Sequence, residues 1–332
     1  MAIPYHLSIV IPVYNEVAVL PQTYARLLTV MEPYDYELIF VDDGSQDASL
    51  SLLQRLASLN NRVKVLAFSR NFGHQPAVSA GLHYAKGDAV VLIDADLQDP
   101  PEVIPAMVSA WEDGYDVVYG VRQDREGESW SKKITAYVFY RFLRSISDVD
   151  IPVDSGDFRL LSRPVVNVIN AMPESHRFVR GMTAWAGFRQ TGVPYRRAAR
   201  AAGESKYPWR KMWHLSLDAV TSFSVAPLRW VRRVALTVAL AALVASIWLI
   251  RQKLIYPQSL ILGWTSVMVS ILWLGALQLG AIGIIGEYMA HVVDQVRQRP
   301  LYVIARAWNF EDVSLPVTAP LHVRPQKISG EG

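Results

Sequence analysis

The sequence predicts an α/β fold, a mostly parallel β-sheet with helices on both faces, followed by a helical hairpin in a membrane. Two observations support this prediction. Short β-rich runs alternate with amphipathic stretches in the first two hundred residues, and two long uncharged runs lie in the C-terminal third. Alternating strands and helices are typical of parallel sheets, and about 20 apolar residues suffice to cross a bilayer.

The N-terminal half contains five expected strands and four expected helices. We expect strands at 7–13, 37–41, 63–68, 89–93 and 117–119, and helices at 19–31, 48–59, 76–85 and 101–111. The first run has no basic segment before it and no small-residue cleavage site after it, which favours a buried strand over a signal peptide. Ligands of such sheets bind beyond the carboxyl ends of the strands.

Composition limits the class of protein. Hydrophobic residues make up 51% of the 332 residues and charged residues 19%, which excludes an intrinsically disordered chain. The net charge of +3 is too small to indicate nucleic acid as a partner. Because there is no cysteine, disulfides, thiolate zinc sites and cysteine nucleophiles are excluded.

The uncharged runs are Val234–Ile250, of 17 residues, and Leu254–Gly286, of 33. We expect membrane spans at about 233–252 and 259–283. A buried hairpin in a soluble protein is the alternative, but 33 uncharged residues exceed ordinary core helices. Three arginines lie on each flank of the two runs, whereas the loop between them has only Arg251 and Lys253. Positive residues favour the cytoplasmic side, so both termini and the N-terminal domain are expected in the cytoplasm. The chain would then be a multi-pass protein of the plasma membrane.

Four regions follow from these patterns. Residues 1–205 are expected to form the catalytic domain, 206–232 amphipathic interfacial helices, 233–290 the hairpin and 291–332 a cytoplasmic tail. Residues 189–233 hold ten basic and two acidic residues interleaved with aromatic ones, which favours anionic lipid as a partner. A plain membrane-surface anchor is the alternative for most of these basic residues.

Carboxylates follow the expected strands. Asp43 follows the second strand, and Asp94, Asp96 and Asp99 follow the fourth. The sequence has neither a dinucleotide-binding glycine motif after the first strand nor a P-loop. A site rich in carboxylates repels a bare diphosphate, so a divalent cation is expected between them. Asp94 and Asp96, with Gln98, are the expected oxygen ligands of Mg²⁺ or Mn²⁺.

Six segments of the sequence carry motifs that occur together: 11–16, 41–45, 94–102, 154–160, 176–182 and 202–207. Together they resemble glycosyltransferase family 2, which implies a GT-A fold. Within it they most resemble polyprenyl-phosphate glycosyltransferases: bactoprenol glucosyltransferases, formamido-arabinose transferases and, more distantly, dolichyl-phosphate mannose synthases. The Q-x-x-R-W motif of processive synthases is missing, which disfavours polymer synthesis.

The resemblance implies a nucleotide-sugar site, a metal site and a lipid-phosphate site. Asp157 and Asp96 would be the catalytic residues. The metal would be held by Asp94, Asp96 and Gln98. The nucleotide-sugar would contact Pro12, Tyr14, Glu16, Val41, Asp43, Asp94, Ala95 and Gln98. The acceptor phosphate would contact Arg122, Lys132, Lys133, Arg200, Ser205 and Lys206.

Several of these roles have alternatives. Asp157 is either a general base or a residue that orients the acceptor or stabilises positive charge on the sugar. A helix N-cap, or a buried ion pair with Arg159, is the structural alternative. Glu16 is equally well an acid at a helix start, favoured by the helix dipole. His74, in a loop near the expected sugar pocket, is interpreted as structural.

The predicted function is inverting, metal-dependent transfer of one hexose, with glucose from UDP-glucose as first choice, to undecaprenyl or a similar polyprenyl phosphate on the cytoplasmic leaflet. GDP-mannose, UDP-formamido-arabinose, UDP-N-acetylglucosamine and UDP-galactose are alternative donors. A non-catalytic lipid-binding partner and a cytosolic sugar-nucleotide enzyme are the rivals from other classes. Gly280, Gly283 and Gly286 permit close helix packing, and thus a homo-oligomer, with a tetramer as first guess.

Overall fold

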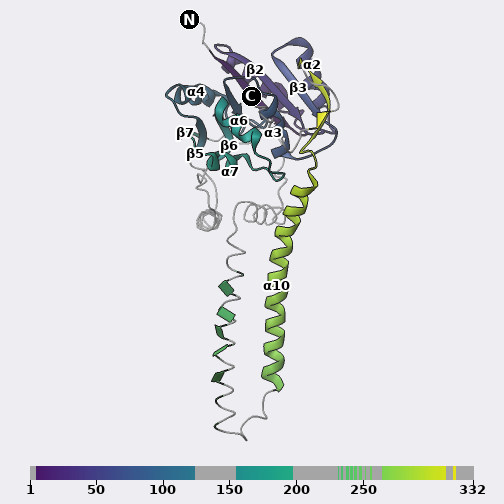
Figure 1. Cartoon of the computed structure of the whole chain (residues 1–332). Coiled ribbons are helices and arrows are strands. Elements are labelled where there is room, and N and C mark those ends of the chain that lie inside the picture. Colours follow the sequence, from purple (N-terminus) through teal and green to yellow (C-terminus); the bar gives the residue numbers. More distant parts are fainter. Residues whose placement is uncertain are drawn as a thin grey trace, which may run out of the picture. The chain divides into compact units, whose positions relative to one another are not determined.

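The computed structural model describes residues 5–123, 155–196, 264–311 and 317–318, with scattered helical positions between 231 and 255. The chain divides into two compact units. One contains a β-sheet and the helices packed on it, and the other contains the long helix α10 (Trp264–Arg297) (Figure 1). The predicted domain boundaries stay predictions, because several of them fall on residues outside the described ranges.

The sheet has the described strand order β7-β5-β6-β4-β1-β2-β3-β8-β9. The four central strands, β4, β1, β2 and β3, run parallel, which confirms the predicted parallel core. Antiparallel pairs lie on both flanks, where β6 meets β4 and β8 meets β3. The strands are β1 (His6–Val13), β2 (Asp35–Asp42), β3 (Val63–Phe68), β4 (Ala89–Leu92), β5 (Val117–Gln123), β6 (Ser155–Ser162), β7 (Gln190–Arg196), β8 (Val303–Trp308) and β9 (Val317–Thr318).

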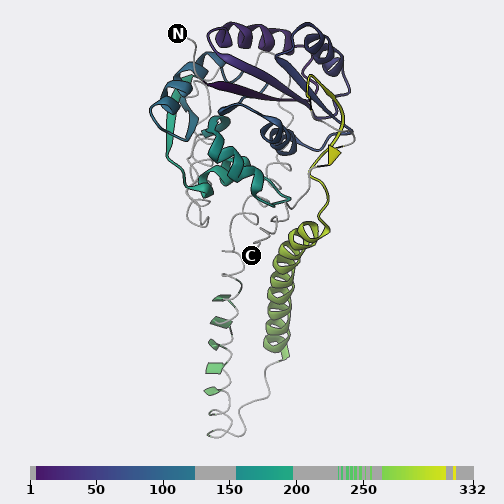
Figure 2. The same ribbon diagram turned by 45° about the horizontal axis from the view of Figure 1, so that its top comes forward.

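Helices cover both faces of the sheet, as predicted (Figure 2). Alternation along β1 shows the reason: Ile9 and Ile11 join one core cluster and Val10 the other. The first cluster is closed by α1 (Leu20–Met31), α2 (Ser49–Leu59) and α4 (Ile104–Glu112). The second is closed by α3 (His74–Tyr84), α6 (Arg163–Ala171) and α7 (Val179–Ala186). A 3-10 turn, η1 (Pro101–Val103), precedes α4.

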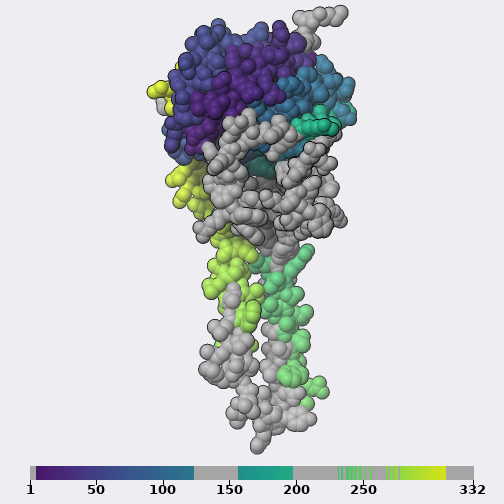
Figure 3. All heavy atoms as spheres, turned by 180° about the vertical axis from the view of Figure 1, so that it is seen from behind, coloured from purple at the N-terminus to yellow at the C-terminus, as the bar shows by residue number. Residues whose placement is uncertain are grey.

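Residues 291–332 do not all form the predicted tail, because a segment after α10 belongs to the sheet. β8 pairs antiparallel with β3, and Tyr302 is buried and stacks on Phe68 with ring centroids 5.1 Å apart. In the space-filling view this yellow segment lies against the purple and blue N-terminal elements (Figure 3). The local sequence pattern does not predict this strand, because a short strand near the edge of a sheet is specified by the neighbour it pairs with.

Helix α10 has 34 residues, so it is about 51 Å long at 1.5 Å per residue. Within the described ranges, one helical segment, Trp273–Arg297, is long and apolar enough to cross a membrane. The first predicted span lies largely outside the described residues, so the hairpin is not confirmed. An added Cβ at Gly280, Gly283 or Gly286 would meet no described atom within 4 Å, and the predicted homo-oligomer stays a prediction.

Candidate functional site

The loops after β1 and β2 are hydrogen-bonded to each other at the carboxyl edge of the sheet. The amide of Asn15 donates to Ser45 Oγ at 3.0 Å, and Asn15 Oδ1 accepts from the amide of Gln46 at 2.7 Å. Asn15 has a φ of 55°, a left-handed conformation that asparagine tolerates. Tyr14, next to Asn15 in this cross-linked loop, is 38% exposed.

The predicted nucleotide contacts differ in accessibility. Pro12 and Glu16 are half-buried, whereas Val41 and Ala95 are buried, so only the backbone of those two could reach a ligand. Helix α1 begins at Leu20 and its first turn has no acidic residue. The backbone carbonyl of Glu16 accepts from the amide of Leu20 at 3.0 Å, so Glu16 lies in the turn that leads into the helix, and both interpretations of its carboxylate stay predictions.

Asp43 fastens the loop after β3. Its buried carboxylate accepts hydrogen bonds from the amides of Phe72 at 2.7 Å and Gly73 at 2.9 Å. Gly44 makes the close approach possible, because it has a φ of +69° and an added Cβ would lie 2.5 Å from the carbonyl carbon of Arg70. Burial raises the pKa of Asp43, and the two amide bonds oppose that rise.

Three aspartates follow β4 in three different environments. The Asp94 side chain is 37% exposed, Asp96 is almost buried and Asp99 is fully buried. Asp96 Oδ1 accepts from the amide of Gln98, whose side chain is half-buried, at 3.1 Å. Burial, with like charge from Asp157 and Asp96, raises the pKa of Asp94 to about 6, although His74 opposes it. A cation would relieve this repulsion.

His74 lies between two carboxylates that are far apart in sequence. Its Nε2 is 3.4 Å from Asp157 Oδ2 and 3.8 Å from Asp94 Oδ1. Burial lowers the pKa of His74, but the hydrogen bond to Asp157 and the charge of Asp94 outweigh it, and the pKa rises to about 9. Antiparallel pairing of β6 with β4 brings Asp157 to this position. His74 is therefore not a loop residue, because it is the first residue of α3 and contacts both carboxylates, and its expected place near the sugar pocket stays a prediction.

Asp157 is neither an N-cap nor the hydrogen-bonded partner of Arg159. It lies in β6, where Arg180 from α7 donates to its Oδ1, at 3.0 Å from Nη2. Arg159 instead donates to Thr183 Oγ1 at 2.6 Å and to the Gly156 carbonyl at 2.9 Å. The N-cap alternative is thus wrong. Arg159 lies two residues along the same strand, on the same face, and its charge helps to lower the pKa of Asp157, so the ion-pair alternative stays a prediction.

Arg122 is the one predicted acceptor residue within the described ranges. It lies on β5, with Nη2 3.8 Å from Asp99 Oδ1 and Nε donating to the Tyr195 hydroxyl at 3.3 Å. The remaining predictions for the acceptor phosphate, Lys132, Lys133, Arg200, Ser205 and Lys206, lie outside the described residues.

The donor set suits a metal shared with a substrate. No group of three or more His, Cys, Asp or Glu side chains able to hold a metal occurs in the described part of the chain. Asp94 and Asp96 nevertheless provide two hard carboxylates at one strand end. Mg²⁺ commonly binds one or two carboxylates and completes its shell with water and substrate phosphates. The residues present therefore fit such a metal.

Four residues for which the sequence motifs predict no binding or catalytic role contact the candidate site residues: His74, Asp99, Arg180 and Tyr195. Arg180 stands in the quoted segment 176–182, together with Arg177. Their spacing cannot show which arginine faces Asp157; Arg177 instead donates to the carbonyls of Ile169 and Met172.

The family match and the most similar curated proteins agree that this chain is a glycosyltransferase. Residues 8–169 match the family described as Glycosyl transferase family 2. The chain is 45% identical over 310 residues to the glycosyltransferase YkcC of Bacillus subtilis, covering 93% of this chain and 96% of that protein. It is 42% identical over 303 residues to the bactoprenol glucosyl transferase of Shigella phage SfII, with 91% and 98% covered.

Solved structures resemble part of the chain. S. aureus TarS in complex with UDP-GlcNAc has a TM-score of 0.44 and 15% identity, covering 65% of this chain and 66% of that one. Glucosyl-3-phosphoglycerate synthase from Mycobacterium tuberculosis, in complex with Mn²⁺, UDP-glucose and glycerol 3-phosphate, has a TM-score of 0.45 and 19% identity, covering 66% and 78%.

Proposed function

Because this chain belongs to glycosyltransferase family 2, we propose that it transfers one hexose from a nucleotide-sugar to undecaprenyl phosphate or a similar polyprenyl phosphate. Relatives named bactoprenol glucosyl transferase match over at least 90% of both chains, which supports a lipid-phosphate acceptor. Glucose from UDP-glucose is the first choice of donor, and the other nucleotide-sugars named above are the alternatives.

The observation that carries the proposal is the group formed by Asp94, His74, Asp157 and Arg180. The phosphate of a lipid monoester has a second pKa near 6, so at neutral pH it is largely a dianion and attacks without a base. Asp157, ionised and held by His74 and Arg180, has a fixed negative charge. That charge would stabilise the positive charge that develops on the sugar during a single inverting displacement.

Asp94 and Asp96, with Gln98, would hold Mg²⁺ or Mn²⁺ beside the donor diphosphate. The ion would supply Lewis acidity that stabilises the departing nucleoside diphosphate. Tyr14 and Glu16, on the loop tied to the β2 loop, would line the nucleotide. Asp43 would act by holding the loop after β3, because its carboxylate is buried and accepts from two backbone amides of that loop.

A membrane location follows from the same proposal. The acceptor is a lipid, and Trp273–Arg297 has the length and composition of a span. With the positive-inside bias of the sequence, the catalytic unit would face the cytoplasmic leaflet.

The test is a transfer assay with the purified full chain in detergent. Labelled UDP-glucose, UDP-galactose, UDP-N-acetylglucosamine and GDP-mannose are each offered with undecaprenyl phosphate, with Mn²⁺ or with EDTA. We expect metal-dependent label in the lipid phase from one donor, lost in Asp96→Ala and kept in Asp113→Ala, an exposed aspartate at the end of α4. Label that appears only in water, as free sugar, would contradict the lipid acceptor.

A further inference from the structure

Arg122 is held on one side by two residues that the proposed chemistry leaves unused. Its Nε donates to the Tyr195 hydroxyl at 3.3 Å, and the Tyr195 hydroxyl donates to Asp99 Oδ1 in a short hydrogen bond. The direct approach of Arg122 Nη2 to Asp99 Oδ1 is 3.8 Å. A paired arginine and carboxylate share hydrogen bonds of about 2.7–2.9 Å. Asp99 therefore orients the guanidinium through the tyrosine rather than through a bidentate pair.

Asp99 and Tyr195 are more deeply buried than Arg122, the residue whose guanidinium they hold. Asp99 is 1% exposed and Tyr195 is 4% exposed, whereas the Arg122 side chain is 23% exposed. Tyr195 is directly opposite Arg122 in the parallel β5–β7 pairing. Its ring packs edge-on against Phe158, with centroids 5.8 Å apart. The two supporting residues are buried, whereas part of the Arg122 side chain reaches the surface.

Two glycines make room for this arrangement. An added Cβ at Gly120 would lie 2.6 Å from Cε1 of Tyr195, and one at Gly156 would lie 2.6 Å from Nη2 of Arg122. Gly156 directly precedes Asp157. The guanidinium is thus seated beside the strand that carries Asp157, and β5, β6 and β7 lie next to one another in Figure 1.

The charges leave Arg122 able to bind an anion. Burial raises the pKa of the Tyr195 phenol to about 12, with the charge of Asp99 adding to it, so the phenol stays protonated and keeps donating. Within the described residues, Nη1 of Arg122 has no protein partner. A guanidinium that has a fixed Nε and an Nη1 without a partner among the described residues is suited to a phosphate.

We propose that Tyr195 and Asp99 are positioning residues, which hold the Arg122 guanidinium in place for the phosphate of the lipid acceptor. The inference rests on the proposed function, since it assumes a lipid monophosphate as second substrate. Asp99, third in the run of strand-end aspartates, then serves the acceptor and not the metal. The same chemistry would also suit the donor diphosphate, and the test distinguishes the two.

The central variant is Tyr195→Phe, with Tyr119→Phe as matched control on strand β5. We expect the KM for undecaprenyl phosphate to rise about fivefold in Tyr195→Phe, the fold-change that corresponds to one hydrogen bond. The KM for the nucleotide-sugar and kcat should stay within about twofold, and Tyr119→Phe should match the wild type. Asp99→Asn, which keeps the size of the side chain, should raise the same KM.

A double-mutant cycle separates positioning from general stability. Arg122→Lys keeps the charge but has no Nε fork for Tyr195 to orient, so adding Tyr195→Phe to it should raise the acceptor KM no further. Three results would overturn the proposal: an unchanged acceptor KM in Tyr195→Phe, a rise in donor KM alone, or a Tyr195→Phe effect that persists in full beside Arg122→Lys. Absence of lipid transfer by the wild type would instead remove the proposed function itself.

Discussion

Arg180 donates two hydrogen bonds to one oxygen of the Asp157 carboxylate, from Nη2 at 3.0 Å and from Nε at 3.3 Å. The pKa of Asp157 lies well below its ordinary range: burial opposes the drop, but the hydrogen bond from His74 and the charge of Arg180 outweigh it. A carboxylate with so low a pKa is a weak proton acceptor at neutral pH. The reaction can therefore use its charge rather than its basicity.

Removing that charge should slow the chemical step. In Asp157→Asn we expect kcat to fall by about 10²–10³, as when one preorganised electrostatic group is lost, with little change in donor KM. Initial rates at saturating substrate measure this, with Asp113→Asn as control for an exposed aspartate. A variant rate within threefold of the wild type would show that the charge is not used.

His74 should compete with a metal for Asp94. Its pKa of about 9 keeps the imidazole protonated at neutral pH, 3.8 Å from Asp94 Oδ1. In His74→Gln a positive charge disappears, so half-maximal activity should need severalfold less Mn²⁺. His83→Gln, on the exposed end of the same helix α3, is the control and should leave the Mn²⁺ titration unchanged. A higher Mn²⁺ requirement in His74→Gln would contradict this competition.

Gly44→Ala should weaken donor binding as well as folding. The left-handed backbone costs a non-glycine residue about 1–2 kcal/mol, and the new Cβ would collide with the Arg70 backbone at 2.5 Å. Gly187→Ala is the matched control: its φ is +71°, but the nearest atom to a new Cβ is 3.9 Å away. Thermal unfolding should show a loss in both, and the donor KM should rise in Gly44→Ala alone. Equal donor KM values would mean that the loop after β3 does not shape the nucleotide site.

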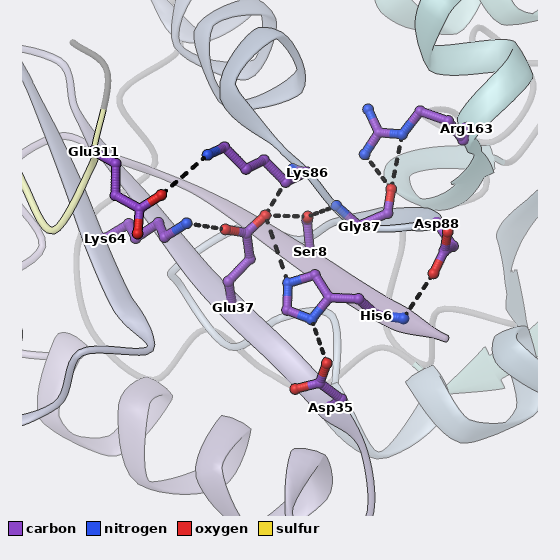
Figure 4. Close-up of polar contacts among 10 residues, drawn as sticks. All are labelled: His6, Ser8, Asp35, Glu37, Lys64, Lys86, Gly87, Asp88, Arg163 and Glu311. Carbon is purple, nitrogen blue, oxygen red and sulfur yellow. Dashed lines mark hydrogen bonds and ion pairs between the residues drawn. The ribbon is translucent and has the colours of Figure 1, made fainter. Parts of the chain in front are cut away.

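Glu37, near the amino end of strand β2, is the centre of a polar cluster (Figure 4). Lys64 Nζ lies 2.6 Å from its Oε2, and the amide of Lys86 donates to its Oε1 at 2.8 Å. Lys64→Met would leave a buried charge without its cation, which costs about 3–5 kcal/mol. Lys86→Met is the control, because among the described residues that side chain pairs with exposed Glu311, at 3.8 Å, and its loss should cost less than about 1 kcal/mol. Chemical unfolding measures both.

The cluster around Glu37 should make the folded protein less stable at acid pH. Burial would raise the pKa of Glu37, but the bonds from Lys64, Ser8 and the Lys86 amide outweigh it and lower the pKa. Because the folded pKa is below the unfolded one, near 4.3, the stabilisation is complete above that value and is lost as pH falls through the folded pKa. The melting temperature of Lys64→Met should therefore respond less to acid below pH 5 than that of the wild type. Parallel melting curves would show that Glu37 is not the titrating group.

Local sequence by itself determined the parallel core and the acidic edge. Strand-length apolar runs bounded by turn residues specify β1 to β4, and the residues that follow them, such as Asp43 and Asp94, must share one edge because parallel strands end together. The resemblance to glycosyltransferase family 2 could also be predicted from the sequence, since each of its motifs is a short contiguous segment.

Only the tertiary structure decided which groups meet. Antiparallel insertion of β6 beside β4 sets Asp157 against His74, and parallel pairing of β5 with β7 sets Tyr195 beside Arg122. Such long-range pairings depend on register and on which face each side chain takes, and a one-residue slip would reverse both. The distinction between Asp94, half-buried beside His74, and Asp99, buried and bonded to Tyr195, is likewise a matter of packing, because the two residues look alike in the sequence.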